Sequence, residues 1–489
     1  MPHEPDEDIG FGPFCVALIG DFSGRSNRGA CESGAAIAGR KPIRVDRDNL
    51  DEVLARTAPQ LHLSLGNENA TEVFLRFERL DDFHPDQLYE RLPIFRSLRK
   101  TRDQLADPAL FAQSARELAA EVPPPPQGAE SDLSNPPIGL LDQVLDETSR
   151  SEDRERPSVG ADLRAFLRRI VAPHVVPTLD ARQSELLAQF DSALGDVVRA
   201  LLHHPDYQAL ESLWRAVFFL TRGTETGTQL QLHLIDIARG ELELDLEQSV
   251  EESGLYKLLV ESSVGTPGGT RWSVLASDYF FGPDPGDIQL LRHLASLASR
   301  AGAPWISAAA PPLAGLQSFV HAPEPSDWSD ETSQAWESLR QDPEAKWLGL
   351  ALPRFLLRLP YGADTEPCEE LSFEEMPAAQ ALHEAYLWGN PAFACAHLLA
   401  QSFSEAGWAL RPGMHLKIDR LPLHLSKVNG ELEAKPCAET LLTERAAQRL
   451  LEKGLMPLAS FKDSGLAKLV RFQSVADPLA PLAGPWAGA

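Results

Sequence analysis

The sequence of 489 residues has no apolar run close to the roughly 18 residues that a membrane-spanning helix needs. Its first residues, MPHEPDEDIGFG, are acidic, whereas a secretory signal peptide begins with a basic stretch followed by an apolar one. These absences argue against membrane insertion and predict a protein that stays in the cytoplasm.

Cysteine and positive charge are also scarce. The chain carries 45 Lys and Arg against 71 Asp and Glu, and its formal charge of −26 repels nucleic acid and anionic membranes. The cysteines are odd in number, widely scattered and never arranged as CxxC or beside paired histidines, so we expect reduced, mostly buried thiols and no metal site. They are Cys15, Cys31, Cys368, Cys395 and Cys437.

Motifs of known catalytic chemistry are missing as well. No HExxH, GxSxG or carboxylate-rich calcium loop occurs, and the glycine-rich stretch 263–272 lacks the GK[ST] ending of a phosphate-binding loop. A turn is the better interpretation of that stretch. His203 and His204 precede Pro205, which favours a helix entry over a metal site. The sequence therefore predicts neither an enzyme nor a cofactor.

The first segment, residues 1–121, has the pattern of a mixed α/β domain. PFCVALIGDFSG predicts a buried strand and a turn, and IRVDRDNLDEVLART predicts a strand followed by a helix with Asp48 or Asn49 as its N-cap. LHLSL and VFLRFERL alternate as half-buried strands do. Apolar residues at helical spacing from Gln87 onward predict that this domain ends in helices.

Residues 122–160 predict a domain boundary, because a proline cluster is followed by charge-rich sequence with little apolar material. Within this linker, Leu140, Leu141, Val144 and Leu145 fall on one face of an expected short helix. Two interpretations stay open. The helix docks on its own domain, or it is a peptide held out for the groove of a partner.

The second segment, residues 161–489, begins with helical patterns, the clearest of which starts at Pro205. Strand-like stretches follow at residues 228–238, 271–281 and 347–362. We therefore predict an α+β (mixed α/β) fold of two domains, each a mixed sheet covered by helices.

Two arginines in the stretch WLGLALPRFLLRLPYG are candidate binding residues. Arg354 and Arg358 could bind an anion as a pair, but arginines in such apolar surroundings more often bridge nearby carboxylates at an interface. We expect interface ion pairs. A set of tryptophans in the second segment is expected to lie in the core, namely Trp214, Trp272, Trp305, Trp347, Trp388 and Trp408.

Several blocks occur in the order of a known pair of proteins. FCVALIGDFSGR, IRVDRDNLDEVLARTAPQL and VFLRFERLDDFHPDQL resemble the small sheath subunit (TssB, or VipA) of bacterial type VI secretion systems. LHHPDYQALESLWRAVFFL, WSVLASDYFFGPDPGDIQLL, APWISAAAPPLAGLQSF, WLGLALPRFLLRLPYG, YLWGNPAFACA and KPCAETLLTERAAQRLLEKGLMPL are similar to the large subunit (TssC, or VipB). The chain thus resembles a fusion of the two subunits.

This resemblance implies a structural, non-catalytic component of a contractile tube wall in the cytoplasm. Its implied partners are other sheath subunits, the inner tube protein, the baseplate and the disassembly AAA+ ATPase (ClpV-like). GLLDQVLDE is similar to the large-subunit helix that this ATPase grips, which would give Leu140, Leu141, Val144 and Leu145 that role. A fusion would also fix a one-to-one ratio of the two halves.

Two departures from the family pattern concern the ends of the chain. The strand that precedes the first core strand in the small subunit is not seen here, and the large-subunit region stops soon after LVRFQSVADP. Both pieces share strands between protomers in the family, so their loss is expected to weaken polymerisation. An alternative function follows, in which the chain is an assembly-incompetent homologue that caps, nucleates or regulates the sheath.

Overall fold

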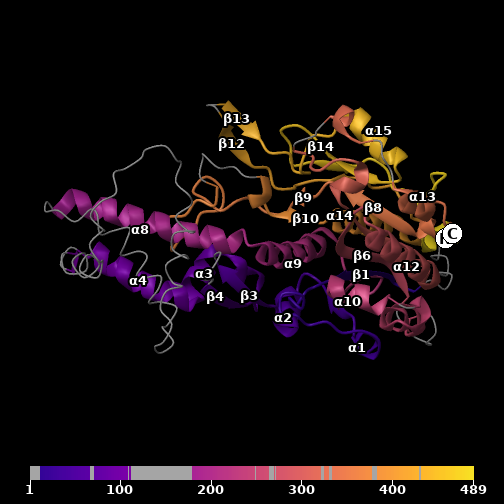
Figure 1. Ribbon diagram of the computed structural model, residues 1–489, viewed down its shortest axis with the longest axis horizontal. Helices are drawn as coiled ribbons and strands as arrows, with labels where there is room; N and C mark the ends of the chain where they lie inside the picture. The colour runs from indigo at the N-terminus through magenta and orange to yellow at the C-terminus, as the bar shows by residue number, and fades with distance from the viewer. Residues whose placement is uncertain are drawn as a thin grey trace, which may run out of the picture. The chain divides into compact units, whose positions relative to one another are not determined.

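The structure is a computed structural model. It describes residues 12–65, 71–107, 110–111, 179–247, 249–263, 269, 271–320, 324–329, 333–376, 383–428 and 431–488 (Figure 1). These residues have the mixed α/β fold that the sequence predicts. The chain divides into two compact units, of which unit 1 comprises residues 1–59, 209–359 and 382–489, and unit 2 comprises residues 60–208 and 360–381.

Unit 1 is built on a nine-stranded mixed sheet with the order β11-β15-β14-β8-β7-β6-β1-β5-β2. The six central strands from β14 to β5 run parallel, while β2, β15 and β11 add antiparallel pairs at the two sides. The strands are β1 (Phe14–Gly20), β2 (Ile43–Val45), β5 (Leu230–Asp236), β6 (Trp272–Phe281), β7 (Trp305–Ala309), β8 (Leu348–Leu352), β11 (Lys417–Ile418), β14 (Met456–Ser460) and β15 (Ala467–Leu469).

Strand β1 comes from the first segment but lies inside this sheet, between β5 and β6 of the second segment. Every residue of β1 is buried, as a parallel strand covered on both faces requires. Its register with β5 runs without a break from Phe14 opposite Leu230 to Gly20 opposite Asp236. The two segments therefore share one sheet.

Helices cover both faces of the sheet in unit 1. Cys15, Ala17 and Ile19 of β1 belong to the core cluster that includes α12, whereas Phe14 stacks on Phe403 of α14 with ring centroids 4.7 Å apart. This alternation follows from the two-residue period of a strand. The helices are α1 (Ala35–Ala38), α2 (Leu50–Thr57), α9 (Pro205–Gly223), α10 (Arg239–Asp245), α11 (Gly254–Tyr256), α12 (Pro285–Ala301), α13 (Gln334–Arg340), α14 (Pro391–Ala406) and α15 (Glu444–Glu452).

The ends of α12 and α14 follow from local sequence. Both helices have proline in the first turn, where its fixed φ suits the helix and its missing N–H costs nothing. Asn390 caps α14 by accepting a hydrogen bond from the N–H of Ala392. Gly302 ends α12 at a φ of 68°, in the left-handed region that glycine adopts without strain. Two small antiparallel two-stranded sheets complete the unit, β9 (Phe355–Leu356) with β10 (Trp388–Gly389) and β12 (Leu425–Val428) with β13 (Glu431–Ala434).

Unit 2 contains a two-stranded sheet and helices. Strands β3 (Gln60–Leu65) and β4 (Thr71–Arg76) form an antiparallel hairpin in which Leu61, Leu63 and Leu65 are buried, as the alternating pattern predicts. Its helices are α3 (Pro85–Arg91), α4 (Pro93–Ala106) and α8 (Leu179–Leu202). Arg102 of α4 and Asp191 of α8 form an ion pair at 2.6 Å, which joins helices from the two segments.

The described residues confirm most of the local predictions. Asn49 occupies the N-cap position of α2, although its side chain accepts a hydrogen bond from the N–H of Asp46 and does not cap the helix. Cys15, Cys395 and Cys437 are buried free thiols, as expected. Trp214, Trp272, Trp305 and Trp388 are buried, whereas Trp347 and Trp408 are partly exposed.

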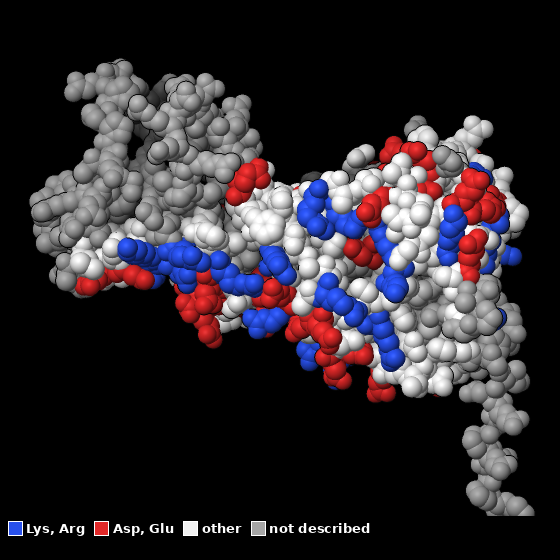
Figure 2. All heavy atoms as spheres, turned by 90° about the horizontal axis from the view of Figure 1, so that it is seen from below, with Lys and Arg blue, Asp and Glu red and all other residues white. Residues whose placement is uncertain are grey.

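Some predictions fall on residues that the structure does not describe. The linker 122–160, with Leu140, Leu141, Val144 and Leu145, lies outside the described ranges. Among the helices that are described, none is both long enough and apolar enough to cross a bilayer. Basic and acidic side chains alternate over the face in Figure 2, so the net charge is not spread there as one acidic surface.

Candidate functional site

A group of polar contacts between the two segments lies beyond the carboxyl ends of β1 and β5 in the nine-stranded sheet. Strands β1 and β5 are parallel, so the residues that follow both of them meet at the same edge. The loop after β1 supplies Arg25 and Glu32, and α1 is followed by Arg40. Helix α10, which follows β5, supplies Glu241. We call these four residues the junction cluster.

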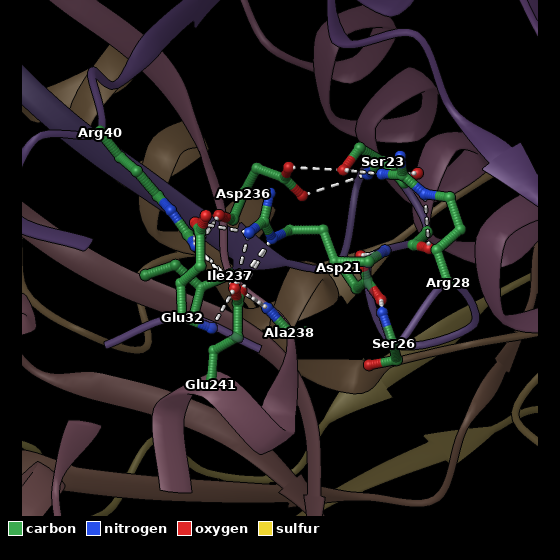
Figure 3. A network of polar contacts seen from close by, with 12 residues as sticks. Asp21, Ser23, Ser26, Arg28, Glu32, Arg40, Asp236, Ile237, Ala238 and Glu241 are labelled. Atoms are coloured by element: carbon green, nitrogen blue, oxygen red, sulfur yellow. Dashed lines mark hydrogen bonds and ion pairs between the residues drawn. The ribbon is translucent and has the colours of Figure 1, made fainter. Parts of the chain in front are cut away.

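Glu241 is the centre of the junction cluster (Figure 3). Its side chain is 0% exposed and accepts hydrogen bonds from Arg25 Nε at 2.9 Å and from Arg40 Nη2 at 2.7 Å. Glu32 binds the same two guanidinium groups at 2.6 and 2.9 Å from the outside, where it is 51% exposed. Arg40 also donates to the backbone oxygen of Asp236 at 2.6 Å. Two arginines of the first segment are thus fixed to the second segment.

The junction cluster contains equal numbers of positive and negative side chains. Burial alone would raise the pKa of Glu241, but hydrogen bonds from Arg40, Arg25 and the N–H of Ala238 outweigh it and lower that pKa to about 2. Glu241 is therefore ionised at neutral pH, and its two arginine partners together with Glu32 make two cations and two anions.

A second carboxylate of α10 ties the same elements together. Asp245 accepts hydrogen bonds from the backbone N–H of Gly34 at 2.6 Å, Gly254 at 3.0 Å and Leu255 at 2.8 Å. The backbones approach so closely that a Cβ on Gly254 would lie 2.1 Å from the oxygen of Gly34. Only glycine fits there.

Three further carboxylates lie near the carboxyl ends of β1, β5 and β6. Asp236 accepts hydrogen bonds from the N–H and the hydroxyl of Ser23. Burial, followed by the neighbouring charge of Asp21, raises the pKa of Asp278 to about 8. At neutral pH Asp278 is mainly protonated, so it adds little negative charge beside Asp21.

The junction cluster holds the two segments together. Among the described residues, it offers no arrangement of groups that suits catalysis. Each charged atom of Glu241 already has a partner, and each arginine of the cluster is paired. A general base or a nucleophile would need a free, accessible group next to a substrate cavity. The junction cluster ties the residues that follow β1 to the helix that follows β5.

Arg354 pairs with carboxylates of its own chain. Its guanidinium lies 2.6 Å from Glu439 and 3.2 Å from Glu384, and His383 also contacts Glu439 at 3.1 Å. Burial would raise the pKa of Glu439, but the hydrogen bond from His383 and the charge and hydrogen bonds of Arg354 lower it to about 2. Arg354, Glu384 and Glu439 line a cavity of about 310 Å³ at the ends of β6, β7 and β8.

Arg358 is in a separate, deeper ion-pair group. Its Nε donates to Glu211 at 2.8 Å, and Arg215 donates to the same oxygen at 2.7 Å. Glu211 is 0% exposed and Arg358 only 4%. The structure therefore does not bring Arg354 and Arg358 together as an anion site, and their place at an interface between protomers stays a prediction.

Arg25, Arg40 and Glu241 are not predicted as site residues by the sequence. The arginines precede Glu241 by about 200 residues, so no local spacing relates them. The available signal was that the stretches FSGR and GRKPIRV contain arginines beside apolar strands, which is common in folded proteins.

Comparison with known protein families finds two matches on consecutive parts of the chain. Residues 12–122 match the family described as "Type VI secretion system, VipA, VC_A0107 or Hcp2". Residues 184–476 match "EvpB/VC_A0108, tail sheath N-terminal domain". The first match contains Arg25 and Arg40 of the junction cluster, and the second contains Glu241.

Two characterised relatives come from Pseudomonas aeruginosa. The type VI secretion system sheath protein TssC1 is 32% identical over 349 residues, which cover 68% of this chain and 70% of TssC1. The sheath protein TssB1 is 29% identical over 99 residues, which cover 19% of this chain and 55% of TssB1. The chain thus spans little more than half the length of this second relative.

Proposed function

Because the chain belongs to the type VI secretion tail sheath proteins and joins a VipA-like region to a VipB-like region, it is a structural sheath component, and we propose that it supplies both halves of one sheath protomer. The boundary between the two regions would lie within residues 122–160. In conventional systems two separate chains supply these regions, whereas here a single chain would supply both.

The observation that carries this proposal is the shared sheet. Strands β1 and β2 of the VipA-like region pair with β5 and β6 of the VipB-like region, and the junction cluster adds charged contacts beside them. The two regions of such a protomer would stay together under mechanical force, because separating them would require pulling buried strands apart.

Further partners follow from membership of the family and are part of the proposal. We infer that the protomer works in the cytoplasm, packs against other sheath subunits, surrounds an inner tube protein and starts from a baseplate. Catalysis is not part of this role. Contraction would use differences in protomer contacts between two states of the sheath, not bond chemistry.

Negative-stain electron microscopy of the purified chain tests the proposal. We expect the chain to form tubes, either alone or together with conventional sheath subunits, and deletion of its gene to stop secretion. Monomers that bind or block conventional sheaths would instead assign the chain to capping or regulation. Secretion that continues unchanged after deletion, with no assembly in vitro, would refute a sheath role.

The ATPase assignment has its own test in the linker. Changing Leu141 and Leu145 to Asp places charges on the expected apolar face, and we predict at least a tenfold loss of binding to the disassembly AAA+ ATPase, since apolar contact residues typically contribute 1–3 kcal/mol each. The matched control changes Gln143 and Ser149, on the expected polar face, to Asp. Equal binding by all three proteins would remove the assignment, and circular dichroism checks that folding is intact.

A further inference from the structure

Three side chains with metal-binding chemistry converge in unit 2. His84 precedes α3, Asp86 lies in the first turn of α3, and Cys368 belongs to the stretch 361–376 of the second segment. One ligand atom from each residue lies within 4.8 Å of the other two, and all three residues are partly buried. Nearly 300 residues of sequence separate Cys368 from the other two, which is why ligand spacing in the sequence did not predict a metal site.

We propose that His84, Asp86 and Cys368 bind a divalent transition metal of the zinc class. A nitrogen, an oxygen and a sulfur ligand together suit Zn²⁺ or Co²⁺, whereas Mg²⁺ and Ca²⁺ prefer oxygen alone. Metal–ligand bonds of about 2.0–2.3 Å in a tetrahedral site place the ligand atoms roughly 3.3–3.8 Å apart. His84 Nδ1 and Asp86 Oδ2 are already 3.5 Å apart.

The ring of His84 is held with Nδ1 facing the first turn of α3. Its Nδ1 lies 3.2 Å from the backbone nitrogen of Asp86, whose N–H points at it. The ring packs edge-on against Tyr361, with centroids 4.7 Å apart, which limits its rotation. Metal binding at Nδ1 would take the place of the long N–H contact.

The carboxylate of Asp86 is held in place by the loop that carries Cys368. Oδ2 accepts from the N–H of Glu369 at 2.9 Å and Oδ1 from the N–H of Glu370 at 3.1 Å. Each oxygen keeps a second lone pair for a metal, and hydrogen bonds of this kind orient ligating carboxylates in known sites. The same contacts keep Cys368, the preceding residue, beside α3.

The local charge favours a cation. The side chains of Glu366, Glu369 and Glu370 flank Cys368 and are exposed, so the loop attracts a divalent ion to the thiol. One of these carboxylates or a water molecule could supply the fourth ligand. A bound metal would link α3 of the VipA-like region to the 361–376 stretch of the VipB-like region.

Cobalt spectroscopy of the full-length, untagged chain tests the site. After removal of metals with a chelator and reduction of the thiols, we expect one equivalent of Co²⁺ to give a thiolate-to-cobalt charge-transfer band that Zn²⁺ abolishes. Cys368→Ser should remove the band, whereas Cys31→Ser, the same change at an exposed cysteine, should keep it. His84→Asn keeps a capping acceptor before α3 but loses the imidazole, and should weaken Co²⁺ binding at least tenfold.

Each alternative outcome is decisive. No charge-transfer band in the wild-type chain, or a band that persists in Cys368→Ser, would overturn the proposal. A band lost in Cys31→Ser would place the metal elsewhere and overturn it too. The measurement needs no sheath assembly, so its failure leaves the proposed sheath role untouched, and failure of tube formation leaves the metal site untouched.

Discussion

Placing a charge in the middle of β1 should abolish folding of the second segment as well as the first. Ala17 is 0% exposed and its strand lies between β5 and β6, so Ala17→Asp would bury a carboxylate without a partner. A buried, unpaired ion costs several kcal/mol, which is comparable to the 5–15 kcal/mol that stabilise a typical protein. We expect loss of soluble protein, measured as the soluble fraction after expression.

A matched control and a rescue make this result specific. His62→Asp introduces the same charge at an exposed position of β3 and should leave solubility unchanged. Residues 161–489 expressed alone should be insoluble, because their sheet lacks β1 and β2, and co-expression of residues 1–121 should restore solubility. A soluble, folded fragment 161–489 with normal secondary structure would contradict the shared-sheet account.

Removing the carboxylate of Glu241 should be the most damaging single change in the junction cluster. Glu241→Ala leaves the guanidinium groups of Arg25 and Arg40 near a buried site without their main partner. Breaking a buried ion pair costs about 3–5 kcal/mol, which for a chain of this size corresponds to a fall of roughly 3–5 °C in melting temperature. Differential scanning calorimetry at pH 7 measures this fall.

Glu32 provides the comparison within the same cluster. It contacts the same two arginines but is 51% exposed, so Glu32→Ala should cost about 1 kcal/mol or less. Equal destabilisation by the two substitutions would show that burial of Glu241 is not what matters.

The contribution of Glu241 to stability should also depend on pH in the acid range. The pKa of Glu241 is lowered to about 2 in the folded chain, so its stabilising contribution is present above its ordinary value near 4.5 and is lost as the pH falls toward 2. Glu241→Ala should therefore lose less stability than the wild-type chain over this range. A parallel loss in both proteins would argue against the ion pairs as the cause.

The elements of the fold could be predicted from the sequence, but their assembly could not. The apolar run before Gly20 predicts β1, and Pro205 predicts the start of α9, because both signals are local. Pairing of β1 with β5 depends on side-chain packing between residues about 200 positions apart, and no periodicity within either segment encodes it.

The candidate site was predictable only in part for the same reason. Arginine in apolar sequence indicates a carboxylate partner, and Arg354 and Arg358 have such partners in Glu439 and Glu211. Neither partner could be named in advance, since each is distant in sequence. Glu241 carried no signal, because its partners Arg25 and Arg40 lie about 200 residues away in the other segment.

The position of β1 between β5 and β6 also determines how long this strand stays unpaired while the chain is being synthesised. The apolar strand Phe14–Gly20 is made first, but its neighbours are complete only when residue 281 has been synthesised. At 5–20 residues per second, β1 waits roughly 10 to 50 s without its partner strands. During that interval a newly made chain exposes an aggregation-prone segment, and once β6 emerges the two halves meet as neighbours on one polypeptide, without having to find each other in a crowded cell.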